Sequence, residues 1–305
     1  MFESQVYIDR RNRLKKQIGS GLILLLGNDE SPMNYPDNCY PFRQDSTFLY
    51  FFGLDTPDLA AVIDAGAGSE IIFGDDPTID DIIWIKAPPP LNEQAEKTGV
   101  SNAAPSDKLA DHLNKAIGKK QKIHILPPYL PANIIKLQKL LPDAKKDISP
   151  DLIRAVAAQR SYKSEIEIER IEISLDIAYQ MHTKAMKMTR PGVHERQVAA
   201  AIEQTALEVG GCMSFPVIFS RDGQIMHNID YCNILKKGDV VVNDSGAECP
   251  MHYASDISRT IPVGGKFTQR QKDIYNIVFN AQQKAIEAVK PGVEFRDVHL
   301  SLIHI

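Results

Sequence analysis

The sequence predicts two domains: an α/β N-terminal domain over residues 1–155 and an α+β domain of long helices and hairpin strands over residues 156–305. Two observations predict this division. Short β-prone runs alternate with helical patterns in the first half of the chain, which is typical of an α/β domain. Near residue 150 the pattern changes, because Pro142, Ser149 and Pro150 interrupt it and longer amphipathic helices follow.

In the first half, aliphatic and aromatic runs bounded by turn residues predict the strands, and apolar residues at helical spacing predict the helices. The predicted strands are 22–26, 47–52, 60–63, 71–73, 82–85 and 122–126, and the predicted helices are 3–17, 108–116 and 132–141. Gly66-Ala67-Gly68 lacks the third glycine of a dinucleotide-binding loop and precedes a strand instead of a helix, so we interpret it as a turn.

In the second half, a capping box at Ser164-Glu165-Ile166-Glu167 predicts the start of a long helix that ends at Arg190-Pro191-Gly192. A second helix follows and ends at Gly210-Gly211, and a third covers 271–289. The segments AMKMTRPGVHE (185–195) and AIEAVKPGVEF (285–295) are similar, since each ends a helix with a basic residue, Pro and Gly. This weak repeat favours two half-domains related by a pseudo-twofold axis.

The composition excludes several classes of function. The formal net charge is −4, and no run of apolar residues reaches membrane-spanning length, so we expect neither a nucleic-acid nor a membrane partner. The first apolar run, 21–26, is too short and too late for a signal peptide. The four cysteines show no CxxC spacing, which predicts reduced thiols in a cytoplasmic protein.

The candidate metal ligands are Asp244 and Asp256, which lie twelve residues apart in VVVNDSGAECPMHYASDISRT. Residues 240–243 read as a buried strand and 252–260 as a second strand, with a turn near Pro250. A hairpin centred on Pro250 would set the two aspartates opposite each other, with Cβ atoms roughly 5 Å apart. Like charges in that position repel, so the spacing favours a divalent cation between them. A solvated turn and edge residue are the alternative.

Residues 214–267 resemble the catalytic domain of the pita-bread metallopeptidases, the superfamily of methionine aminopeptidase, prolidase and aminopeptidase P. Three segments carry the resemblance: a strand and loop ending in His227, the residues 235–239 that lead into the strand of Asp244, and 255–262 followed by Gly265-Lys266-Phe267. In the first half, RRNRLKKQIGSGLILLLGNDE and YPFRQDSTFLYFFGLD are similar to the N-terminal domain of the creatinase and aminopeptidase P type.

The resemblance implies an aminopeptidase that removes the N-terminal residue from peptides with proline in second position. It also implies two divalent metal ions, usually Mn²⁺, and a homo-oligomer when the protein is full length. Asp244 looks like the bidentate ligand of one metal, and Asp256 like the carboxylate that bridges both. His227 looks like the histidine that hydrogen-bonds near the scissile carbonyl. The other histidines, His124, His182, His194 and His252, are expected to be core or surface residues without chemistry.

The chain departs from the family pattern in two respects. The spacing between the aspartates is one residue longer than the commonest pattern. The later His and two Glu of the family's site have no counterpart, since Glu287, Glu294, His299 and His304 do not stand at matching positions. We therefore expect a C-terminally incomplete catalytic domain, in which the ending LSLIHI resembles sequencing-adapter read-through. Such a chain is expected to be inactive, to expose apolar helix faces and to aggregate.

Three other functions remain open at this point. A metal-free hydrolase of the creatinase-like branch lacks the paired carboxylates, so Asp244 and Asp256 argue against it. Retention of both carboxylates also disfavours a non-catalytic peptide-binding protein. A prolidase-type Xaa-Pro dipeptidase is the nearest alternative, and the segment YPFRQDSTFLYFFG favours aminopeptidase P over it.

Overall fold

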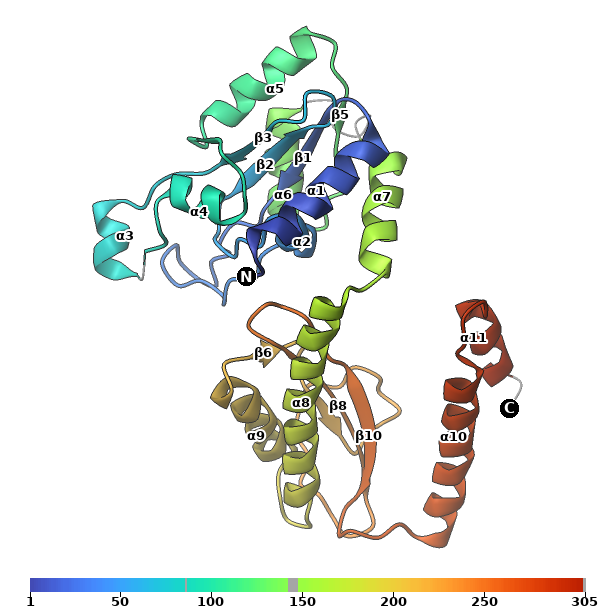
Figure 1. Ribbon diagram of the computed structural model, residues 1–305. Helices are drawn as coiled ribbons and strands as arrows, with labels where there is room; N and C mark the ends of the chain where they lie inside the picture. Colours follow the sequence, from blue (N-terminus) through green and yellow to red (C-terminus); the bar gives the residue numbers. More distant parts are fainter. Residues whose placement is uncertain (86, 142–147, 304–305) are drawn as a thin grey trace. The chain divides into compact units, whose positions relative to one another are not determined.

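The computed structural model describes residues 1–85, 87–141 and 148–303 of the chain (Figure 1). Pro142 and His304, named above, lie outside these residues. The chain divides into two units, Met1–Lys163 and Ser164–Ile305, and each is described by itself. No helix in the described part of the chain is both long and apolar enough to cross a membrane.

The first unit is built on a mixed five-stranded sheet with the strand order β4-β3-β2-β1-β5. Its strands are β1 (Leu22–Leu26), β2 (Ala60–Asp64), β3 (Glu70–Phe73), β4 (Ala103–Ala104) and β5 (Ile123–His124). The central pairs β1–β2 and β2–β3 are antiparallel, whereas β5 and β4 join the two edges in parallel.

Helices cover both faces of this sheet. Successive residues of β1 point to opposite sides, and because they are all apolar, each side needs a covering layer. Ile23 and Leu25 pack against α1 (Ser4–Ile18), α2 (Ser46–Phe52), α4 (Leu91–Lys97) and α7 (Pro150–Ser161). Leu22 and Leu24 pack in a second core with α5 (Lys108–Gly118) and α6 (Pro131–Leu140). The predicted α/β architecture of this half is therefore confirmed.

Two segments predicted as strands are helices. The run 47–52 lies in α2, where the Asp45 side chain accepts hydrogen bonds from the backbone N–H groups of Thr47 and Phe48. The run 82–85 mostly lies in α3 (Ile79–Trp84), which begins with a capping box between Thr78 and Asp81. In both cases side chains satisfy N–H groups that a helix start leaves without partners, and this outweighs the β propensity of aromatic and branched residues.

The second unit contains a three-stranded antiparallel sheet, in the order β10-β8-β7, covered on one face by two helices. The strands are β7 (Ile218–Ser220), β8 (Val240–Ser245) and β10 (Ile257–Pro262), and the helices are α8 (Glu165–Met188) and α9 (Glu195–Glu208). The predicted strand 252–260 thus begins later, at Ile257. A separate two-stranded ladder pairs β6 (Cys212–Met213) with β9 (Ala247–Glu248).

The last helices, α10 (Gln269–Ala288) and α11 (Phe295–Ile303), follow the sheet in sequence (Figure 1). None of the residues of α10 is buried. Large apolar side chains of α10 are exposed, and they are Ile274, Ile277, Val278, Phe279 and Ile286. The structure thus shows an exposed apolar helix face of the kind that the sequence analysis expected.

In the first unit, the fully buried Arg11 of α1 joins three other elements. Its Nε donates to Oε2 of Glu70 at 2.8 Å, Nη1 to the carbonyl of Phe51 at 2.9 Å and Nη2 to the carbonyl of Thr98 at 2.8 Å. Lys15 also binds Glu70, at 2.9 Å. A guanidinium supplies this fork of donors, so one side chain satisfies two backbone carbonyls and a carboxylate.

We expect the substitution Arg11→Met to lower the free energy of unfolding of the first unit by about 3–5 kcal/mol, because it leaves buried acceptors without donors. Hydrogen exchange of the β1–β3 amides measures this loss. Arg13→Met, at an exposed position of the same helix, is the matched control and should change stability by less than about 0.5 kcal/mol. Equal exchange rates in the two variants would contradict the structural role of Arg11.

In the second unit, His182 of α8 forms a buried network with the strand β8. Asn243 donates from Nδ2 to Nδ1 of His182 at 2.9 Å, and Nε2 of His182 lies 3.2 Å from the carbonyl oxygen of Ser245. This arrangement makes Nδ1 an acceptor and Nε2 a donor, which requires a neutral ring. Burial, the largest cause, lowers the pKa of His182, and the positive charge of Arg259 acts in the same direction.

The second unit should therefore lose stability in mild acid. The folded-state pKa of His182 lies below that of the unfolded chain, about 6.5. Its contribution is complete above about pH 6.5 and is lost as the pH falls through the folded-state pKa. Hydrogen exchange of the β8 amides between pH 7 and 5 measures this trend, and His182→Gln should flatten it. His299→Gln, at an exposed position of α11, should keep the wild-type trend; an unchanged trend in His182→Gln would contradict the assignment.

Candidate metal centre

The strands β8 and β10 bring the two predicted ligands, Asp244 and Asp256, to one end of the sheet. Asp244 pairs with Ser258, and Ser245 pairs with Ile257. The expectation that Asp244 would stand directly opposite Asp256 is wrong. These pairs, and the bridge between Glu248 and Ala254, are all centred on residue 251, because the turn includes Met251 as well as Pro250.

Despite the changed register, both aspartates lie on the same face. When the centre of the hairpin moves by one residue, each residue of β8 pairs with a residue two positions further along the return strand. Side chains on a strand alternate with a period of two, so a shift of two positions leaves each side chain on the same face of the sheet. Asp244 faces away from the buried side of β8, which carries Val241, Asn243 and Ser245. Its Oδ1 accepts a hydrogen bond of 2.7 Å from Oγ of Ser258.

The two carboxylates interact directly. Partial burial raises the pKa of Asp256, and so do the negative charge of Asp244 and a hydrogen bond with it. A raised pKa means that the doubly ionised pair is unfavourable without a counter-charge. A divalent cation would supply that charge, and the donors are the carboxylate oxygens that hard cations bind. The residues present therefore fit a metal centre of oxygen ligands.

Gly246 makes this close approach possible. A Cβ atom at Gly246 would lie 1.9 Å from the carbonyl oxygen of Ser255 and 3.1 Å from Cα of Asp256. Contacts this short do not occur, so any larger residue would push the strand of Asp256 away from the strand of Asp244. The sequence Asp-Ser-Gly, which alone could have been an ordinary turn, thus places a glycine where two backbones meet.

The third predicted residue, His227, lies in an exposed turn after β7. No described hydrogen bond joins it to either aspartate. The loop that carries it is anchored by Glu195, a fully buried residue at the start of α9. Oε1 of Glu195 accepts from the backbone N–H of Arg221 at 2.8 Å, and Oε2 accepts from that of Asn233 at 3.0 Å.

Sequence reasoning missed the role of Glu195. It gave only one signal, an acidic residue in the first turn of a helix, which is common for electrostatic reasons alone. Among the described residues, one group of three His, Cys, Asp or Glu side chains lies close enough to share an ion, and it is separate from the aspartate pair: Cys212, Glu248 and His252.

Two family models match the chain. The model of the aminopeptidase P N-terminal domain matches residues 7–126, and that of metallopeptidase family M24 matches residues 169–304. The first lies within the first unit and the second within the second unit.

Among curated proteins, the Xaa-Pro aminopeptidase of Escherichia coli (strain K12) is 28% identical over 99% of this chain and 71% of its own length. The Xaa-Pro aminopeptidase of Haemophilus influenzae is 29% identical over 97% of this chain and 70% of its own length. A Chaetomium globosum protein named "Probable Xaa-Pro aminopeptidase" is 28% identical over 95% of this chain, which spans 49% of that relative.

Solved structures of E. coli aminopeptidase P are similar as well. The low-pH form has a TM-score of 0.88 and 26% identity, with 99% of this chain and 72% of that chain covered. The form described with the inhibitor Pro-Leu has a TM-score of 0.87 at the same identity and coverage. With both domain models in sequence and the aspartate pair on the sheet, the chain belongs to the aminopeptidase P group of metallopeptidase family M24.

Proposed function

We propose that the chain is part of an Xaa-Pro aminopeptidase, which hydrolyses the bond between an N-terminal residue and a following proline. The observation that carries this proposal is the pair Asp244 and Asp256 on one face of the β8–β10 ladder, with the raised pKa of Asp256. The names of the relatives and the inhibitor Pro-Leu bound by E. coli aminopeptidase P support the substrate class.

In this proposal, Asp244 would be a ligand of one divalent ion and Asp256 a ligand of two, and Mn²⁺ is the expected metal. When bound, such ions would supply a hydroxide at neutral pH and a positive charge that stabilises the developing oxyanion. Ser258 fixes the Asp244 carboxylate by its hydrogen bond of 2.7 Å. His227 donates a hydrogen bond near the scissile carbonyl, and Glu195 holds the loop on which it lies.

A proline imide has no N–H, so substrate recognition at this bond depends on its carbonyl and on the free α-amino group of the preceding residue. The match to the aminopeptidase P N-terminal domain favours an aminopeptidase over a prolidase-type dipeptidase. Homo-oligomer formation and a cytoplasmic location stay predictions.

We expect Asp256→Asn to weaken Mn²⁺ binding by the 305-residue chain at least tenfold, because it removes the carboxylate assigned to both ions. The loss of the free Mn²⁺ signal in electron paramagnetic resonance measures binding. Asp244→Asn should act in the same direction. With two protein ligands assigned, we expect weak binding in the wild type and no measurable cleavage of an Xaa-Pro peptide by this chain.

Asp273→Asn is the matched control, since Asp273 is exposed on α10 and accepts its hydrogen bond from Gln269. It should bind Mn²⁺ as the wild type does. Binding that survives the loss of both Asp244 and Asp256 would overturn the proposed metal centre. Measurable cleavage of an Xaa-Pro peptide by the wild-type chain would contradict the expected inactivity, and cleavage at any other bond would overturn the proposed substrate class as well.

A further inference from the structure

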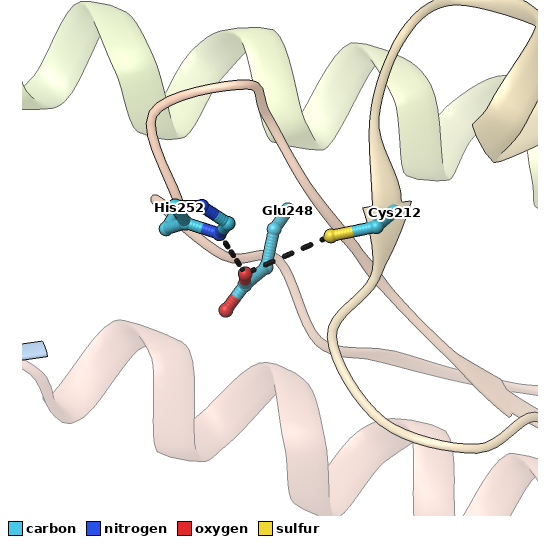
Figure 2. A group of neighbouring side chains, drawn as sticks. All are labelled: Cys212, Glu248 and His252. Atoms are coloured by element: carbon cyan, nitrogen blue, oxygen red, sulfur yellow. Dashed lines mark hydrogen bonds and ion pairs between the residues drawn. The ribbon is translucent and has the colours of Figure 1, made fainter. Parts of the chain in front are cut away.

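A second set of potential metal ligands lies where β6, β9 and the turn after β9 meet (Figure 2). Oε2 of Glu248 is 3.8 Å from Sγ of Cys212 and 2.6 Å from Nδ1 of His252. One ligand atom from each of the three residues lies within 4.8 Å of the others. Figure 2 shows that the thiol and the imidazole both face the Glu248 carboxylate.

The fold fixes the positions of all three side chains. Cys212 and Glu248 are directly opposite each other in the antiparallel β6–β9 ladder, so they share one face. His252 follows in a tight turn, in which its N–H donates to the carbonyl of Cys249 at 2.8 Å. The backbone of His252 is left-handed, with φ of 61°, and this conformation returns the ring to Glu248.

The donor types are those of a zinc site. Thiolate, imidazole and carboxylate all bind Zn²⁺, at roughly 2.0–2.3 Å in a tetrahedron, so the ligand atoms should be roughly 3.4–3.6 Å apart. The separation of Sγ from Oε2, 3.8 Å, is already close to that value. The separation of Nδ1 from Oε2, 2.6 Å, would open by less than about 1 Å when an ion replaces the shared proton.

The burial of the group suits an ion with three protein ligands. The side chains of Glu248 and His252 are 11% and 12% exposed, whereas Cys212 is on the surface. The carboxylate and imidazole are therefore largely withdrawn from water, and the exposed side leaves a fourth position for a water molecule. Without an ion, the Glu248 carboxylate accepts a hydrogen bond from the Cys212 thiol and forms an ion pair with His252, and a cation would replace both contacts.

We propose that Cys212, Glu248 and His252 bind Zn²⁺ at a site separate from the aspartate pair. The two sites differ in chemistry, because sulfur and nitrogen donors select borderline and soft cations, whereas paired carboxylates select hard ones. The sequence analysis gave His252 no chemical role. A bound ion ties β6 to β9 and to the turn, and so restrains the hairpin between β8 and β10.

Co²⁺ titration of the 305-residue chain tests the proposal, because a cobalt–thiolate bond absorbs in the near ultraviolet and a site of oxygen ligands alone does not. We expect one equivalent of Co²⁺ to produce this absorption and Zn²⁺ to remove it by displacement. Cys212→Ser should abolish the absorption, and His252→Gln and Glu248→Gln should each weaken Co²⁺ binding at least tenfold.

Cys232→Ser is the matched control, because Cys232 is likewise exposed but lies outside the group, and it should leave the absorption unchanged. Circular dichroism checks that each variant is folded, and a loss of fold in one variant leaves the other two to decide. Absence of the thiolate absorption in the wild type, or its persistence in Cys212→Ser, would overturn the zinc site.

Discussion

The antiparallel pairing of β8 with β10 is the constraint on which the rest of the second unit depends. It holds Asp244 and Asp256 on one face, where the charge of Asp244 helps to raise the pKa of Asp256. Repulsion between two carboxylates in this position destabilises the metal-free sheet, so packing on the opposite face of the sheet must offset that free-energy cost. That face carries the buried Val241, Asn243 and Ser245, which pack against the helices. The packing of the buried face thus offsets the repulsion between the two carboxylates, and a bound cation would attract both of them.

The buried face of β8 fixes the register of the strand because some of its side chains are polar and form hydrogen bonds. Asn243 and Ser245 are fully buried, and they alternate with Asp244 along the same strand. Their hydrogen bonds with His182 fix the strand relative to α8 at the position of the aspartate. A purely aliphatic face would let a short strand shift more easily, whereas a buried network with matched donors and acceptors allows one register. Gly246 then lets the return strand approach, so backbone and side chains specify the same geometry.

The sequence predicted the long helices well, because capping and apolar spacing are local signals. It failed where two local signals disagreed. The run 47–52 is rich in aromatic residues and was predicted as a strand, but Asp45 before it and the left-handed Gly53 after it cap a helix, Ser46–Phe52. The sequence could predict that the two aspartates share a face, because they are an even number of residues apart in a hairpin. It could not predict their register, since that depends on whether the turn closes around Pro250 or Met251. Glu195 was missed because its partners lie 26 and 38 residues away.

The position of Gly246 also explains how one hairpin can present two different sets of donors. Before Gly246 the chain is paired with β7 and β10, and it presents the carboxylate of Asp244 near that of Asp256, which directly precedes β10. After Gly246 it is paired with β6, and it presents Glu248 to a thiol and an imidazole. Because the hard and the mixed donors lie in different ladders, a cation suited to one set finds few suitable ligands in the other. In the two proposed sites, the same hairpin would thus present hard donors in one ladder and mixed donors in the other.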